Sequence, residues 1–309
     1  MLRLFLELGP CLLIGLAAGR RWPLLAERLA PWLLQWGMPL SLMGLLLRAG
    51  LQGQTLSVAL LTLLSCSAGL LLTRSVPQLR RLLAQRSLQI GAVVGNTAYV
   101  GLPVAIALLP PQALAITITV DLVGTLVTWS LGPVLLADQR GGRRWRLLPL
   151  VMRTPVMRAL LLAMPVALTP WASAVGQWLW WPARGVLWCL LALVGMRLGA
   201  LLQDPALSVD RRGWLAVLPA ALIKLLVWPC LLLVVVQLLR WPAWVAAPVV
   251  LQAAVPTAMS VLLLAEATPA RHRGLEVAMA ARLVLVSTLA AVVTIPLWSW
   301  LLTRLVPAG

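Results

Sequence analysis

The stretch that decides the fold is Gly95-Asn96-Thr97-Ala98-Tyr99-Val100-Gly101-Leu102-Pro103, which lies between the apolar runs Leu88 to Val94 and Val104 to Leu109. It holds the only asparagine and the only tyrosine of the 309-residue chain. An amide, two hydroxyls, two glycines and a proline within an apolar segment predict a helix break at bilayer depth. Because lipid offers no hydrogen bonds, the backbone groups freed by such a break need partners from protein, ion or water. Broken membrane helices typically line a cavity, which in transporters binds the substrate.

The composition predicts an all-α polytopic membrane protein. Hydrophobic residues make up 61% of the chain, charged residues only 11%, and the mean hydropathy is +0.97, which is far from the range of water-soluble domains. The net charge of +17 does not indicate a nucleic-acid partner, because the arginines stand at the ends of apolar runs rather than on a polar face. The partner that this pattern predicts is the lipid bilayer.

Apolar runs of about 17 to 25 residues are read as membrane spans. Ten such spans are expected, of which the first and the sixth are short. They are Leu4 to Gly19, Pro31 to Leu47, Leu56 to Leu72, Leu88 to Leu109, Leu114 to Leu136, Pro155 to Ala172, Val186 to Leu202, Trp214 to Leu239, Trp244 to Ala265 and Leu275 to Leu302.

The basic residues alternate between the connections as a membrane topology requires. With ten spans, seventeen of the 25 lysines and arginines fall on one side and only five on the other. Positively charged loops stay in the cytoplasm, so both termini are predicted to lie outside. Arginine outnumbers lysine 24 to 1, which is typical of a GC-rich bacterial genome. We therefore expect a multi-pass protein of the bacterial cytoplasmic (inner) membrane.

The longest polar stretch divides the chain into two sets of five spans. Residues 1–137 are predicted to form a first five-helix repeat, 138–149 a basic cytoplasmic linker and 150–309 a second five-helix repeat. An odd number of spans in each half places two related halves in opposite orientations. The fourth span of the second half contains Gln252-Ala253-Ala254-Val255-Pro256-Thr257-Ala258-Met259-Ser260. Interrupted spans at equivalent positions of inverted repeats point to a transporter's binding site, so helices four and nine are expected to be broken and to cross.

The two prolines explain how the breaks would work. Each lacks an N–H and clashes with the carbonyl four residues earlier, so Pro103 should free the carbonyl of Tyr99 and Pro256 that of Gln252. Crossing half-helices would then bring their dipole ends together at the midplane. The alternative is that these prolines only kink two packed spans. The residues expected to bind substrate or ion are Asn96, Thr97, Tyr99, Gly101, Pro103, Asp121, Lys224, Gln252, Pro256, Thr257 and Ser260.

Two of these residues carry charge deep within predicted spans. Asp121 lies about 12 Å into span five at 1.5 Å per residue, and Lys224, the only lysine, lies near the middle of span eight. Charges at this depth are costly and usually face the protein interior. Asp121 could carry a proton or bind a cation, and Lys224 could receive a carboxylate. Alternatively they form a structural ion pair with each other, or Lys224 reaches the interface. Arg197 and Arg282 are read equally as interface anchors or as groups that attract substrate.

The string from Gly95 to Pro103 closely resembles the glycine-asparagine-threonine-glycine-tyrosine-leucine-glycine-leucine-proline motif of bacterial auxin efflux carrier (AEC) family permeases. Further similarity lies in the Ala-Val-Pro-Thr-Ala run of the ninth span, in Arg153-Thr154-Pro155, in Asp121 and in Lys224. Ala98 stands where a glycine is common in the family. The resemblance implies ten helices in two inverted repeats, with spans four and nine crossing at the site. It also implies transport of organic anions, such as auxin in plants and dicarboxylates in bacteria.

The sequence thus favours a secondary active transporter that moves a small organic anion, such as a dicarboxylate or an auxin-like carboxylate, by alternating access. The alternative is a membrane sensor or scaffold of the same fold that does not transport. An enzyme is not expected, because the chain has one histidine and no recognisable catalytic grouping. No cofactor or metal is predicted, since the four cysteines have no paired spacing. Proton or sodium coupling and a homodimeric state are left open.

Overall fold

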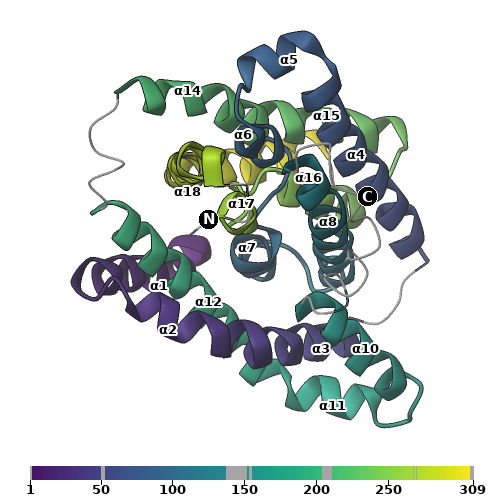
Figure 1. Cartoon of the computed structure of the whole chain (residues 1–309). Coiled ribbons are helices and arrows are strands. Elements are labelled where there is room, and N and C mark those ends of the chain that lie inside the picture. Colours follow the sequence, from purple (N-terminus) through teal and green to yellow (C-terminus); the bar gives the residue numbers. More distant parts are fainter. Residues whose placement is uncertain are drawn as a thin grey trace.

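The computed structural model describes residues 2–49, 53–136, 152, 155–203, 211–266, 268 and 270–306, and the described part is helical apart from turns and one isolated bridge (Figure 1). The predicted linker 138–149, together with Arg153 and Thr154, lies outside these residues. The elements are α1 (Leu2–Arg21), α2 (Leu25–Trp32), η1 (Leu33–Gly37), α3 (Met38–Ala49), α4 (Thr55–Ser75), α5 (Pro77–Leu82), α6 (Arg86–Gly91), η2 (Thr97–Gly101), α7 (Leu102–Leu108), α8 (Ala113–Leu136), α10 (Pro155–Ala167), α11 (Ala172–Trp178), α12 (Trp180–Leu201), α14 (Arg211–Leu222), η4 (Ile223–Val227), α15 (Trp228–Leu238), α16 (Ala243–Ala253), α17 (Ser260–Glu266) and α18 (Ala270–Leu305).

Among the described residues, six helices are long and apolar enough to cross a membrane. They are Leu25–Arg48, Thr55–Ser75, Ala113–Leu136, Trp180–Leu201, Arg212–Leu238 and His272–Leu305. Large apolar side chains on their outer faces are exposed, among them Leu56 at 79% and Leu238 at 77%. In water such surfaces would associate, whereas in lipid they are solvated. The chain is therefore a multi-pass membrane protein. The predicted spans four and nine contain shorter apolar helices, Thr97–Leu108 and Ala243–Ala253, because both segments are interrupted.

The helices form two sets that lie side by side (Figure 1). One set, here called the flanking layer, consists of α1, α2, α3, α10, α11 and α12, in which α12 contacts both α1 and α3 while α10 and α11 pack on α3. The other set, here called the crossing bundle, consists of α4 to α8 and α14 to α18. An apolar cluster that includes Leu42, Leu102, Ile118 and Leu187 joins the two sets. We refer to this contact as the seam.

Glycines bring α1 and α12 into backbone contact within the flanking layer. A Cβ atom added to Gly15 would lie 2.1 Å from the carbonyl oxygen of Ala192, and one added to Gly195 would lie 2.3 Å from that of Leu12. Gly19 and Gly199 are enclosed in the same way. Small residues four apart allow membrane helices to approach this closely, and van der Waals contacts then hold them together. These four glycines therefore fix the position of α1 on α12.

Three prolines each follow a short π-helix. The segments η1, η2 and η4 end two residues before Pro39, Pro103 and Pro229 respectively. Because proline cannot donate to the carbonyl four residues earlier, the chain widens locally into i→i+5 bonding. For Pro229 that carbonyl belongs to Leu225, and it accepts a hydrogen bond from Trp298 Nε1 at 2.8 Å. The Pro229 kink is thus a packed structural feature whose freed backbone group is satisfied by α18.

Candidate functional site

The two interrupted spans meet at a short antiparallel bridge between Gly95 and Thr257. The backbone N–H of Asn96 donates to the carbonyl of Pro256 at 2.7 Å, and the N–H of Ala258 donates to the carbonyl of Val94 at 3.1 Å. Each break therefore supplies partners for the backbone groups that the other one frees. This pairing meets the requirement that no polar backbone group is left bare within the bilayer.

The interruption in the first of these spans lies earlier than the proline rule predicted. Helix α6 ends at Gly91 and η2 begins at Thr97, whereas Pro103 occupies the first turn of α7, which continues η2. Within this continuous helix, the π-helical bonding of η2 accommodates the N–H that Pro103 lacks. The break is instead centred on Gly95. In the second span, Pro256 does lie inside the non-helical segment between α16 and α17.

The ends of the half-helices are capped by polar side chains from neighbouring elements. Thr257 Oγ1 donates to the carbonyl of Gly91 at the end of α6 at 2.9 Å. Lys224 Nζ donates to the carbonyl of Ala253, the last residue of α16. A cation at a helix C-terminus is favourable because that end carries partial negative charge. Lys224 is buried (1% exposed), so this bond places its ammonium group at the crossing.

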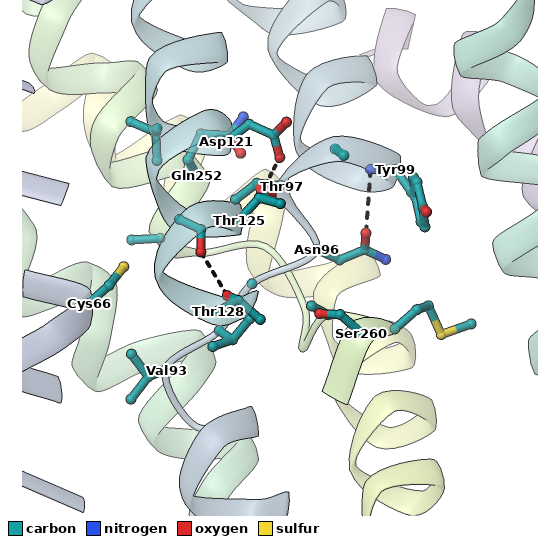
Figure 2. A pocket seen from close by; sticks show the side chains of 18 of the residues that line it. Cys66, Val93, Asn96, Thr97, Tyr99, Asp121, Thr125, Thr128, Gln252 and Ser260 are labelled. Carbon is teal, nitrogen blue, oxygen red and sulfur yellow. Dashed lines mark hydrogen bonds between the residues drawn. The ribbon is translucent and has the colours of Figure 1, made fainter. Parts of the chain in front are cut away.

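The acidic side chain of Asp121 lies near the start of η2. Thr97 Oγ1 donates to Asp121 Oδ1 at 2.5 Å, and the N–H of Tyr99 donates to Asn96 Oδ1 at 3.4 Å (Figure 2). Asp121 is fully buried. Lys224 and Asp121 thus bind different partners and do not form the ion pair that the sequence left open.

A cavity of about 180 Å³ opens beside the crossing. Several polar atoms at this cavity have no hydrogen-bond partner among the described residues: Asn96 Nδ2, Asp121 Oδ2 and both amide atoms of Gln252. Buried polar groups are nearly always paired, so this concentration of unpaired atoms marks a candidate ligand site. Lys224, Arg197 and Asp121 give the lining two cationic groups and one acidic group, an arrangement that favours an anion.

Two glycines let side chains from the second span reach the first. A Cβ atom added to Gly101 would lie 2.1 Å from Gln252 Oε1. A Cβ atom added to Gly95 would lie 3.1 Å from Lys224 Nζ and 2.8 Å from a methyl group of Val255. Close approach to a glycine backbone is a known use of this residue. Gly101 and Gly95 therefore act by leaving room for Gln252 and Lys224.

The structure gathers most of the predicted site residues. Those that line the cavity are Asn96, Thr97, Tyr99, Asp121, Lys224, Gln252 and Ser260. Four others, Gly101, Pro103, Pro256 and Thr257, do not line it. Thr257 uses its hydroxyl to bind Gly91, and its N–H donates to Ser287 Oγ at 3.1 Å. Thr257 thus holds the crossing together instead of facing a ligand.

Other lining residues were missed or left undecided. Thr125 and Thr128 follow Asp121 on one face of α8 and line the cavity (Figure 2). Their spacing of four and three residues is the helical signal that could have identified them. Arg197, from α12, also lines it, whereas Arg282 is buried with its guanidinium 5.9 Å from the ring of Trp214. Within the described ranges no three His, Cys, Asp or Glu side chains gather as a metal site would require.

No family of known proteins matches the chain, and no curated protein matches it. The fold and the site therefore define its class by themselves. It is a helical membrane protein in which two interrupted helices meet beside a polar, partly cationic cavity.

Proposed function

We propose that the chain is a secondary active transporter that moves a small organic anion across the cytoplasmic membrane by alternating access. The observation that carries this proposal is the group of unpaired amide and carboxyl atoms at the crossing, Asn96 Nδ2, Asp121 Oδ2 and the Gln252 amide. A protein that only needed a kinked span would have no reason to keep these atoms buried beside an open cavity. A ligand with hydrogen-bonding groups explains them.

The chemistry of the lining favours a carboxylate. Two side-chain amides can donate to its oxygens, and Lys224 keeps donors beyond the one that binds Ala253, since an ammonium group has three. Arg197 adds a second cation from the opposite side of the seam. The substrate class is thus a dicarboxylate or an auxin-like carboxylate, whose oxygens accept hydrogen bonds that the protein donates. Asp121, whose second oxygen is unpaired, is the candidate for proton linkage.

The helix contacts support ten spans in two inverted repeats. In the numbering of the predicted spans, the contact of α1 with α12 joins span one to span seven. The equivalent contact in the other half is that of α10 with α3, which joins span six to span two. Likewise the contact of α4 with α8 joins span three to span five, and that of α14 with α18 joins span eight to span ten. A two-fold axis that relates the two halves produces matching contacts of this kind, and an odd number of spans in each half places that axis in the membrane plane. On this reading the protein belongs with the AEC family permeases that its sequence resembles.

The two helix sets differ in how they are held, which supports a moving part and a fixed part. Inside the crossing bundle, hydrogen bonds such as those of Asn96 and Thr257 join the elements. The seam, in contrast, consists of apolar side chains. Apolar surfaces without directional bonds can slide over one another, so the crossing bundle would move against the flanking layer in an elevator-like or rocking motion.

The cavity opens toward the cytoplasm if the predicted topology holds. Thr128 and Arg197 lie in the second halves of α8 and α12, and this topology places those halves on the cytoplasmic side. The seam cluster borders the cavity through Met38 and Leu193 and lies toward the other face. The described arrangement therefore corresponds to an inward-open state.

Uptake of labelled dicarboxylates and aromatic carboxylates into proteoliposomes tests the proposal. Asn96→Ala removes a ligand donor, and Pro103→Ala allows η2 to become a regular helix, so both should lose uptake. Thr303→Ala is the control, because this exposed hydroxyl only binds the carbonyl of Trp300 in its own helix. Normal transport by both site variants would refute the site. Ligand binding without flux in the unmodified protein would instead favour the sensor or scaffold.

A further inference from the structure

A second cavity, of about 460 Å³, lies where the connection between α7 and α8 approaches the flanking layer. It is remote from the helix crossing and shares no lining residue with the central cavity. The residues that line it are Arg48, Ala105, Ile106, Ala107, Leu109, Pro110, Pro111, Gln112, Leu114, Trp180 and Arg184. Arg48 comes from α3, and Trp180 and Arg184 come from α12, whereas the other lining residues come from α7, α8 and their connection, so the cavity spans the seam.

Its two arginines both contact the ring of Trp180. The guanidinium of Arg48 lies 4.1 Å from the centroid of the Trp180 ring, and that of Arg184 lies 5.6 Å from the same ring. Only five basic residues are predicted on the outer side of the membrane, and this cavity contains two of them. None of its lining residues is acidic. Two cationic groups at one cavity attract an anion.

Other groups at the cavity also suit an anion. Gln112 contributes a side-chain amide, and helix α8 begins at the next residue, so its partly positive end faces this side. Guanidinium groups bind the planar oxygens of carboxylate and phosphate through paired hydrogen bonds. A further arginine–tryptophan contact, Arg304 at 5.2 Å from the Trp300 ring, lies outside this cavity.

We propose that this cavity is an oxyanion-binding site for one carboxylate or phosphate group, held between Arg48 and Arg184. The bound group would join the flanking layer to the α7–α8 connection of the crossing bundle. The apolar seam cluster separates it from the central cavity, since Leu114 and Ile106 belong to or pack on that cluster and line the outer cavity. An anion here would stabilise the described arrangement of the two helix sets. The site needs no transport activity to exist.

Thermal unfolding in an uncharged detergent tests this site, with inorganic phosphate added at constant ionic strength against chloride. Phosphate should raise the unfolding temperature of the unmodified protein in a saturable way. Arg48→Gln and Arg184→Gln should each weaken the apparent phosphate affinity about tenfold or more, since a charge-assisted hydrogen bond is lost. Arg304→Gln removes a comparable arginine–tryptophan contact outside the cavity and should leave the phosphate response unchanged.

The central cavity also holds cations, so Arg197→Gln serves as a second control and should keep the response. If Arg197→Gln abolishes it while Arg48→Gln and Arg184→Gln retain it, the proposal is wrong. Native mass spectrometry after reconstitution with phosphatidylglycerol distinguishes the source of the oxyanion. Retained lipid that the Arg48→Gln variant loses identifies a lipid headgroup, whereas a phosphate response without retained lipid identifies a soluble anion. The absence of both the phosphate response and the retained lipid would overturn the proposal.

Discussion

Replacing Gly101 by alanine separates the role of the site from the stability of the fold. The new Cβ atom would lie 2.1 Å from Gln252 Oε1, whereas ordinary contact begins near 3.4 Å. The amide must therefore retreat by about 1.3 Å, the difference between these distances. The side-chain amide of Gln252 has no hydrogen bond among the described residues to resist this movement, and alanine gains about 0.5–1 kcal/mol over glycine within a helix. The unfolding temperature should therefore change little.

Ligand binding should respond strongly to the same change. A displaced amide loses its hydrogen bond to a charged ligand, which is worth about 1.5–3 kcal/mol and corresponds to an affinity loss of about 10- to 100-fold. Uptake kinetics in proteoliposomes, measured beside thermal unfolding, would show this as a raised KM in a normally folded protein. Gly274→Ala is the control, because no heavy atom lies within 4 Å of its added Cβ. Unchanged kinetics in a well-folded Gly101→Ala protein would refute the role of Gln252.

Three further predictions concern other parts of the molecule. Lys224→Met removes the cation at the crossing and should weaken anion affinity at least about tenfold in a binding titration; an unchanged Kd would contradict this role. Gly15→Ala should lower thermal stability by about 1–3 kcal/mol through overpacking against Ala192, unlike Gly185→Ala, whose added Cβ meets nothing; equal stability of the two would contradict the close packing. A variant that retains only Cys66, which lines the central cavity, should react with a membrane-impermeant thiol reagent from the cytoplasmic face and be protected by substrate, whereas labelling from the outer face alone would contradict an inward opening.

The sequence predicted the helical class and the two interruptions because both are local properties. Apolar runs identify membrane helices, and the polar groups from Gly95 to Pro103 are visible without a structure. The first break is centred nearer Gly95 than Pro103, because a π-helical turn accommodates the missing N–H of Pro103 within a continuous helix. The number of spans and the inverted repeat stay predictions, supported by the exchange of helix partners.

The arrangement of the site depends on contacts that no local pattern contains. That Lys224 binds the end of α16, and that Thr257 binds Gly91 instead of a ligand, follows from how distant segments pack. Arg197 lines the cavity because its helix, α12, lies across the seam from the crossing bundle. The threonines of α8, in contrast, were open to prediction, since they repeat at helical spacing after Asp121.

The bridge between Gly95 and Thr257 also constrains how the protein is made. The backbone groups of the first break find their partners on a segment synthesised much later, since Gly91 and Thr257 are 166 residues apart in the chain. Until the ninth span leaves the ribosome and inserts, the exposed N–H of Asn96 has no partner in lipid. The first half of the chain therefore stays incompletely folded in the membrane until the second half has inserted. Separately expressed halves should assemble only when both are present in the same bilayer.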